Sequence, residues 1–246
     1  MIVRTAHRSC RFIGFSIMLI LWMGLSDAQA TGTKVVVRAL AKDAMFIGTS
    51  MGGANLIIRD VESGAILAEG RTHGDTGSPV TVIQEPRKRG RPLSDPSTAK
   101  VETSLNLLEP TLVSIEARAP ASQRQSRIKA STQLWLLPGK DIEGDGVILE
   151  IPSFAVNILS PQPAERVQLS SLQSVPITLN VLMMCGCPIT PDGLWDANQY
   201  EVAGIVKHNG IPVDTVSFIY GGKPNTFQGN LELHDPGSYE IQACAF

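Results

Sequence analysis

The pentapeptide Gly48-Thr49-Ser50-Met51-Gly52 has the G-x-S-x-G spacing that presents a nucleophilic serine in α/β-hydrolases. That chemistry needs a strand before Ser50, a helix after it, and a histidine that accepts the hydroxyl proton. Residues 54–60 instead resemble a strand, and His208 falls in an Asn-Gly hairpin turn. We therefore predict a Gly-rich turn before a core strand and no catalytic residue, and rank a serine hydrolase acting through Ser50 third among the functions.

A second stretch, Met183-Met184-Cys185-Gly186-Cys187, is rich in sulfur. On an extended strand the side chains of Met183, Cys185 and Cys187 share one face, and three soft sulfur donors there would select Cu(I). The same face carries Ile177, Leu179 and Val181, so these sulfur side chains equally suit a hydrophobic core. Free core thiols and a copper site both remain open.

The segment Asp141-Ile142-Glu143-Gly144-Asp145-Gly146 spaces three carboxylates, those of Asp141, Glu143 and Asp145, like the start of a calcium loop. The twelfth position of that loop would be Pro152 instead of a bidentate glutamate. We therefore expect a β-turn here and no calcium.

Residues 1–30 have the pattern of a secretory signal peptide. Three arginines (Arg4, Arg8, Arg11) precede a short apolar run, and Ala28-Gln29-Ala30 forms an A-x-A cleavage site. The apolar run is shorter than the roughly 20 residues that span a bilayer. We predict a periplasmic or secreted protein with no transmembrane segment after cleavage.

Cleavage would remove three arginines and one aspartate, which changes the net charge from −2 to −4. An acidic chain opposes general binding to phosphate backbones. Residues 86–92, Pro-Arg-Lys-Arg-Gly-Arg-Pro, contain an R-G-R-P core that can enter a DNA minor groove. In a secreted acidic protein we interpret them as an exposed loop between strands, and we predict no nucleic-acid partner.

Short β-branched runs separated by Gly, Pro, Asn and Asp predict an all-β protein. Two prolines within residues 160–164 suggest a boundary between modules at 31–159 and 160–246. The strands we expect are 34–40, 55–60, 65–72, 100–107, 111–119, 132–137 and 147–151 in the first module, and 177–185, 199–207, 213–220, 227–233 and 239–245 in the second.

Two segments resemble known β-sandwich families. Residues 54–72, ANLIIRDVESGAILAEGRT, resemble the transthyretin-like or carboxypeptidase-regulatory-like domain, in which two strands flank a D-x-x-S/T-G turn. Residues 202–245, with an N-G-x-x-V hairpin and a terminal P-G-x-Y strand, are similar to bacterial immunoglobulin-like domains. These resemblances imply two tandem β-sandwiches, and neither transfers a catalytic residue.

The immunoglobulin resemblance also implies a disulfide from Cys185 or Cys187 to Cys244, between facing strands. Three cysteines follow the expected cleavage site, so one thiol would remain. Against the bridge, an inward phase set by Tyr239, Ile241, Ala243 and Ala245 turns Cys244 outward unless a bulge intervenes. Disulfide, free thiols and metal ligation all stay open.

We expect a non-catalytic binding or assembly module for another cell-envelope protein, without a cofactor. The alternative is a periplasmic copper-binding protein that uses the Met183–Cys187 strand. A seven-stranded immunoglobulin-like sandwich would need one more strand beside residues 239–246. The last strand, with Tyr239, Ile241, Ala243 and Ala245, therefore leaves an edge that invites strand addition or self-association.

Overall fold

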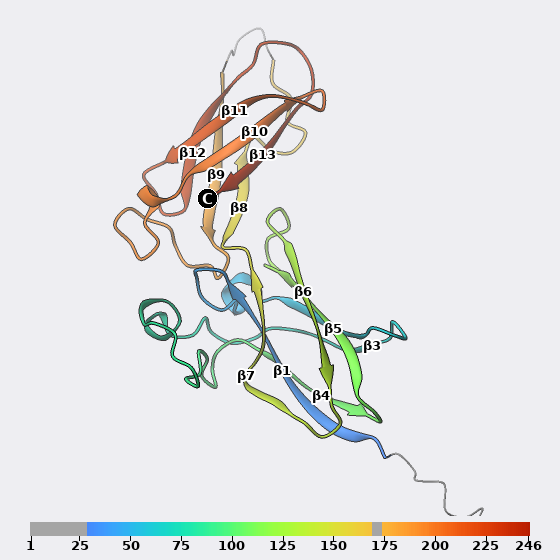
Figure 1. The fold of residues 1–246 in the computed structure, drawn as a ribbon. Coiled ribbons are helices and arrows are strands. Elements are labelled where there is room, and N and C mark those ends of the chain that lie inside the picture. Colours follow the sequence, from blue (N-terminus) through green and yellow to red (C-terminus); the bar gives the residue numbers. More distant parts are fainter. Residues whose placement is uncertain (1–28, 169–173) are drawn as a thin grey trace, which may run out of the picture.

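The computed structural model describes residues 29–168 and 174–246 and confirms the all-β class (Figure 1). Helical structure in this part is confined to three short turns, Thr49–Met51, Val80–Gln84 and Ala197–Gln199. The expected signal peptide lies outside the described residues, apart from Gln29 and Ala30 at its end.

The first module has two sheets. One has the order β4-β1-β7, in which β1 (Thr31–Ala41) pairs antiparallel with β4 (Val101–Leu107) and parallel with β7 (Ile142–Ile151). The other is antiparallel, with the order β3-β2-β5-β6. Its strands are β2 (Asn55–Asp60), β3 (Ile66–Arg71), β5 (Thr111–Ala119) and β6 (Ile128–Leu136).

The second module is one antiparallel sheet with the order β13-β10-β11-β12-β9-β8. Its pairing is sparse between β11 and β12, which meet at two residue pairs, and there the sheet folds over (Figure 1). The strands are β8 (Phe154–Ser160), β9 (Ser174–Met183), β10 (Val202–His208), β11 (Ile211–Tyr220), β12 (Thr226–Glu232) and β13 (Tyr239–Ala245).

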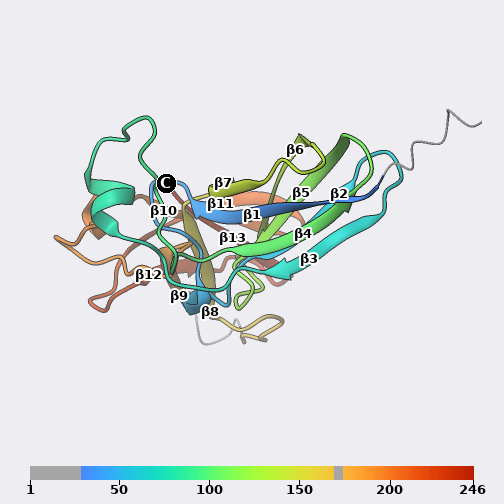
Figure 2. The ribbon, with the colours of Figure 1, turned by 90° about the horizontal axis from the view of Figure 1, so that it is seen from below.

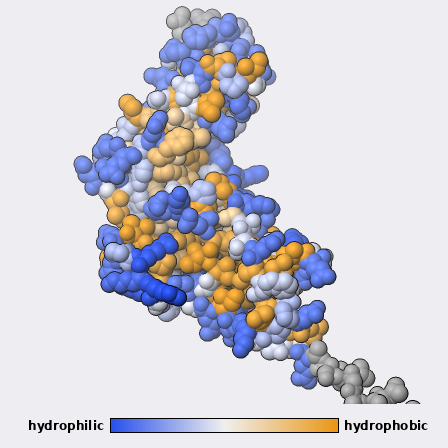
Figure 3. Space-filling view, in the orientation of Figure 1, coloured by the Kyte–Doolittle hydropathy of each residue, from blue (hydrophilic) through white to orange (hydrophobic). Residues whose placement is uncertain are grey.

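Alternation along the strands builds the core. On β9, Ile177, Leu179 and Val181 are fully buried while Thr178 and Asn180 are not, as a period of two requires. Buried side chains of both modules form one continuous hydrophobic cluster, so the interior passes through the junction between them. On the face drawn in Figure 3, hydrophobic residues gather over the middle and the lower part of the molecule.

The chain changes from one module to the other at Pro152 and Ser153. β8 follows at once and pairs with β9 from Phe154↔Met183 to Ser160↔Thr178. Residues 154–159 therefore belong to the second sheet, although the expected boundary at 159/160 places them in the first module. The prolines that suggested that boundary, Pro161 and Pro163, come directly after β8 and end that strand. They do not link the two modules.

Residues 142–146 are part of β7 and not an isolated turn. The β1–β7 register jumps between Val35↔Ile142 and Val37↔Val147, so the Gly-rich residues form a bulge within the strand. Gly144 and Gly146 have positive φ, and a Cβ on Gly146 would lie 2.2 Å from the Val36 carbonyl oxygen. The glycine allows the two strands to approach closely there.

Candidate functional site

The two terminal strands of the six-stranded sheet, β8 and β13, face each other without forming a ladder. Among the described strands, β8 pairs with β9 alone and β13 with β10 alone, yet β8 and β13 lie close together (Figure 1). The second module is thus open along one side. We call the space between the outward edges of these two strands the open seam.

Hydrogen bonds at the strand ends show which backbone groups point into the open seam. The Met184 N–H donates to the Ser153 carbonyl at 2.7 Å, and Glu201 and Phe246 exchange bonds of 3.2 and 2.8 Å. Because antiparallel ladders bond every second residue, the intervening residues direct N–H and C=O outward. On β8 these are Phe154, Val156 and Ile158, and on β13 they are Tyr239, Ile241, Ala243 and Ala245.

Gln125, in the loop between β5 and β6, bonds one residue of the β8 edge. Its Nε2 donates to the Ile158 carbonyl at 3.2 Å, and the Ile158 N–H donates to its Oε1 at 2.9 Å. One side-chain amide thus replaces the pair of hydrogen bonds that a neighbouring strand would make. Nearby, Gln123 accepts a hydrogen bond from Asn157 of β8, so this loop of the first module is fastened to the seam.

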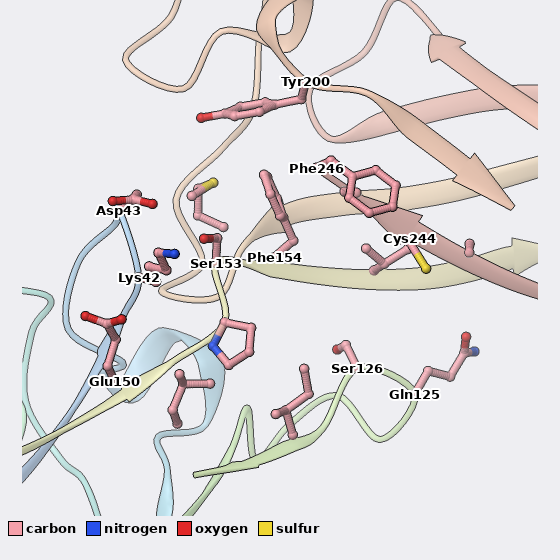
Figure 4. A pocket seen from close by; sticks show the side chains of 17 residues that line it. Lys42, Asp43, Gln125, Ser126, Glu150, Ser153, Phe154, Tyr200, Cys244 and Phe246 are labelled. Carbon is pink, nitrogen blue, oxygen red and sulfur yellow. The ribbon is translucent and has the colours of Figure 1, made fainter.

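At the end of the seam near the junction lies a cleft of about 880 Å³, shown in Figure 4. Phe154 and Tyr200 meet edge to face there, with ring centroids 5.0 Å apart. Lys42, Asp43 and Glu150 line it from the first module, and Cys244 and Phe246 from the opposite side (Figure 4). The cleft therefore combines an apolar interior with charges of both signs at one rim.

The phenol of Tyr200 remains neutral in this cleft. Burial, together with the negative charges of Asp43 and Asp196, raises the pKa of Tyr200 above its usual value. A neutral phenol both donates and accepts hydrogen bonds. Its group can therefore bind either a carbonyl or an N–H of a molecule in the cleft.

A second cleft of about 890 Å³ lies at the far end of the seam. Ile158 and Val175 line one side, and Tyr239 and Ile241 line the other. Tyr239 is held in place by His208, whose ring stacks on it at 4.6 Å. Gln125 lines both clefts, so it lies between them along the seam.

Ser50 lies in the one-turn helix Thr49–Met51, which is followed by β2 and not by a longer helix. Its hydroxyl donates to the backbone carbonyl of Cys185 at 3.3 Å. No hydrogen bond joins Ser50 to a histidine among the residues that the structure describes. The geometry is that of a turn before a strand, as the sequence predicts, and it lacks the strand–turn–helix of a hydrolase. The contact with the second module is a further feature that the structure shows.

The sulfur-rich stretch does not continue β9 as an extended strand. β9 ends at Met183, and residues 184–186 form a turn closed by hydrogen bonds from Gly186 N–H to Met183 O (2.7 Å) and Met183 N–H to Cys187 O (3.1 Å). The glycine allows this turn, because its φ of 87° is disfavoured for other residues. The shared face expected for Met183, Cys185 and Cys187 is therefore wrong.

The turn instead faces Met51. A Cβ on Gly186 would lie 2.9 Å from Met51 Cγ and 3.0 Å from its Sδ. Met183 contributes to the lining of the cleft at the junction. Met51 is thus the thioether that lies against the residue between the two cysteines.

All three described cysteines are free thiols. Cys185 is buried, and Cys187 is half-buried. Cys244 lines the cleft at the junction, and the residues of β13 that pack against the core are Tyr239, Ile241, Ala243 and Ala245. The strand keeps its alternation, and no disulfide joins Cys244 to Cys185 or Cys187 in this structure.

The three carboxylates of residues 141–145 bind different partners and do not converge on one point. Asp141 accepts from the Lys34 N–H at 2.8 Å, and Glu143 pairs with the Lys34 ammonium at 3.1 Å. Asp145 accepts from the N–H groups of Leu93 and Ser94 and from the Ser94 hydroxyl. Within the described residues no three His, Cys, Asp or Glu side chains form a group that could hold a metal.

Residues 86–92 are all exposed, and the segment 80–97 that contains them projects from the strands (Figure 2). Arg91 forms an ion pair with Glu85 at the base of this loop. The other basic residues of this loop form no ion pair with the described residues, which is the arrangement of a solvated loop.

Comparison with protein-family models, curated proteins and solved structures finds no significant match to this chain. No helix in the described part is both long enough and apolar enough to cross a membrane. The fold and the site therefore provide the evidence on function.

Sequence reasoning missed two parts of the site, β8 and Gln125. Residues 154–160, Phe-Ala-Val-Asn-Ile-Leu-Ser, are β-prone and could have been recognised as a strand. Nothing in the sequence marks Gln125, because its role depends on a strand that lies more than thirty residues away along the chain.

Proposed function

We propose that this protein is a non-catalytic binding module of the periplasm or cell exterior, and that it binds an extended segment of another envelope protein in the open seam. The observation that carries the proposal is the pair of facing, unladdered strand edges, β8 and β13. Unpaired backbone groups on a strand edge are a template for an added strand.

The clefts support an occupant with alternating side chains. An added strand would direct every second side chain to the interior, and the interior offers two clefts with apolar walls, one at each end of the seam. Main-chain hydrogen bonds would supply affinity and the clefts would supply specificity, as in other strand additions.

Gln125 supports the same proposal. A buried or half-buried edge with unmet hydrogen bonds is costly, and the amide of Gln125 satisfies one residue of that edge while no partner is bound. We expect it to be displaced when a strand enters, since the strand would bond the same Ile158 groups.

A proline test examines the role of the β13 edge. Ala243→Pro removes an N–H that points into the seam. The hydrogen bonds between β13 and β10 keep all their donors, because the Ala243 N–H is not one of them. Edge strands tolerate proline. Ala243→Ser is the matched control, because it keeps the N–H. A photo-crosslinking residue at Gln242 reports on contacts of the edge in living cells, and the same residue at Gln228 on β12 serves as the comparison.

We expect a crosslink at Gln242 that is absent at Gln228, is lost in Ala243→Pro, and persists in Ala243→Ser. Mass spectrometry should identify the attached peptide as an extended segment of one other envelope protein. A crosslink to a second copy of this chain would show that the strand added at this edge comes from self-association and not from another protein. Equal crosslinking in Ala243→Pro and Ala243→Ser would refute strand addition.

A further inference from the structure

Residues 86–92, Pro-Arg-Lys-Arg-Gly-Arg-Pro, place four basic side chains and no acidic one in seven positions. We call these residues the basic loop. The mature chain expected after cleavage has a net charge of −4 and the basic loop contributes +4, so the remaining residues sum to −8. A protein that is acidic elsewhere thus presents one strongly basic segment.

The fold fastens both ends of the basic loop. Before it, Val82 of the short helix Val80–Gln84 is buried in the hydrophobic core. After it, the Asp145 carboxylate accepts from the N–H groups of Leu93 and Ser94, each at 2.9 Å. The loop projects from the strands between these two fastenings (Figure 2).

A turn forms the tip of the basic loop. The Arg91 N–H donates to the Lys88 carbonyl at 3.1 Å, and Gly90 has a φ of 80°, as at the third position of a type II turn. A Cβ on Gly90 would meet no atom within 4 Å, so the tip packs against nothing in the described structure. The side chains at the tip are therefore accessible to a partner.

Three cations of the basic loop are left for that partner. Arg91 pairs with Glu85, whereas Arg87, Lys88 and Arg89 are exposed and form no ion pair with the described residues. Arginine can bind two oxygens of one phosphate through parallel N–H bonds, so phosphate is the chemistry that matches this set.

The arrangement suits phosphate groups that are laid out on a surface. A polar cleft of about 440 Å³ lies beside Arg87, but three carboxylates line it, those of Asp43, Glu85 and Glu150. These carboxylates oppose a single phosphate ion in the cleft. The cations on the projecting tip can instead meet several phosphate groups at once.

We propose that the basic loop docks this protein onto an anionic lipid bilayer, with Arg87, Lys88 and Arg89 at the lipid phosphates. Each basic side chain near such a surface strengthens binding by about fivefold, so three give on the order of 100-fold. This is reversible docking and not stable anchoring. The acidic remainder of the chain does not cancel it, since exposed charges are screened beyond about 8 Å at physiological ionic strength.

The turn argues against DNA as the partner. A minor groove about 6 Å wide admits an R-G-R-P core only when the backbone is extended along the groove. Here the bond from Arg91 to Lys88 folds that core into a turn. Residues 86–92 also contain no aromatic side chain that could stack on an unpaired base.

Vesicle flotation of the mature chain, residues 31–246, tests the proposal, which does not depend on strand addition at the seam. The probes are vesicles of equal parts phosphatidylcholine and phosphatidylglycerol, vesicles of phosphatidylcholine alone, and a DNA duplex. We expect binding to the anionic vesicles alone, and its loss at about 1 M salt, where the Debye length is about 3 Å. The anionic vesicles should also slow tryptic cleavage within residues 87–91.

The variant with Arg87→Gln, Lys88→Gln and Arg89→Gln should bind the anionic vesicles more weakly by on the order of 100-fold. Its matched control carries the same net charge and should bind as the parent does. That control replaces by glutamine three exposed basic residues that form no ion pair with the described residues, namely Arg124, Lys140 and Lys223. Both variants should keep the Tm of the parent, because the replaced side chains are exposed.

Equal binding to the two kinds of vesicle, undiminished binding in the folded loop variant, or an equal loss in the matched control would overturn the proposal. Tighter binding to the DNA duplex than to the anionic vesicles would overturn it in favour of nucleic acid. Inorganic phosphate should release the protein from vesicles no better than chloride does at the same ionic strength. A release specific to phosphate would show that the loop binds the free ion instead of a lipid surface.

Discussion

The hydroxyl of Ser50 donates a 3.3 Å hydrogen bond to the backbone carbonyl of Cys185 across the junction of the two modules. Next to it, the Met51 side chain rests on Gly186. The turn that resembles a hydrolase elbow in sequence therefore fastens one module to the other. The same contact sets Met51 against the turn that carries Cys185 and Cys187.

Ser50 should not react as a nucleophile. A fluorophosphonate probe should leave it unlabelled in the folded protein, because no histidine in the described part of the chain bonds its hydroxyl. Ser50→Ala should lower the free energy of unfolding by about 1 kcal/mol or less, the typical loss for one hydrogen bond. Mass spectrometry and denaturant titration measure the two effects. Stoichiometric labelling of Ser50 would contradict this assignment.

Gly186→Ala should destabilise the protein more than Gly210→Ala. Both glycines have positive φ, 87° and 84°, so both substitutions incur the same backbone strain, roughly 1–2 kcal/mol. At Gly210 the added methyl meets nothing within 4 Å, whereas at Gly186 it would lie 2.9 Å from Met51 Cγ. The excess loss at Gly186 measures the contact with Met51.

Thermal or denaturant unfolding of the two variants gives the difference. Adding Met51→Ala should reduce the cost of Gly186→Ala, because the clash partner has gone. Equal costs at the two glycines would show that Met51 does not rest on Gly186.

Asp145→Asn should lower the free energy of unfolding at neutral pH by about 1–3 kcal/mol, since hydrogen bonds to a charged group are among the stronger ones. Burial raises the pKa of Asp145, but hydrogen bonds from Ser94 and Leu93 and the charge of Arg38 outweigh it, so the net pKa is lowered. Its stabilisation is therefore complete above the unfolded pKa and is lost as the pH falls through the folded pKa.

The difference between parent and Asp145→Asn should thus shrink in acid, which denaturant titrations at several pH values would show. Glu143→Gln is the control. Its carboxylate pairs with Lys34 on the surface, and such pairs contribute about 1 kcal/mol or less. A difference that grows as the pH falls would contradict the assigned direction.

Hydrogen exchange should alternate along β13. In dilute protein the amides of Ile241, Ala243 and Ala245 point into the open seam and should exchange fast, while those of Gln242 and Cys244 bond β10 and should be protected. The fast amides should slow when a strand is bound or when the protein self-associates. Strong protection of all five in a verified monomer would exclude a free edge.

Trypsin should cut the native protein first within residues 87–91, where four basic side chains lie on an exposed loop. Mass spectrometry of the earliest fragments identifies the site. Initial cleavage elsewhere, with this loop intact, would show that the loop is less accessible than its exposure indicates.

Apart from β8, the strands could be predicted from the sequence, since they depend on local alternation. Residues at i, i+2 and i+4 of one strand share a face whatever the strand's neighbours are. That is why Ile177, Leu179 and Val181 could be assigned to the core, and why the inward phase of residues 239–245 holds in the structure. The exposure of residues 86–92 likewise follows from composition.

Only the tertiary structure decided which edges lack partners and which side chains meet. The bonds of Gln125 to Ile158, and the contact of Met51 with Gly186, join residues far apart in the chain. Neither pair has a local signal, because each depends on how two modules pack. The end of β9 at Met183 also depends on the tertiary structure. Just after it, Gly186 with its positive φ turns the chain toward the other module. Alternation is a property of one strand, whereas pairing and contact are properties of the whole fold.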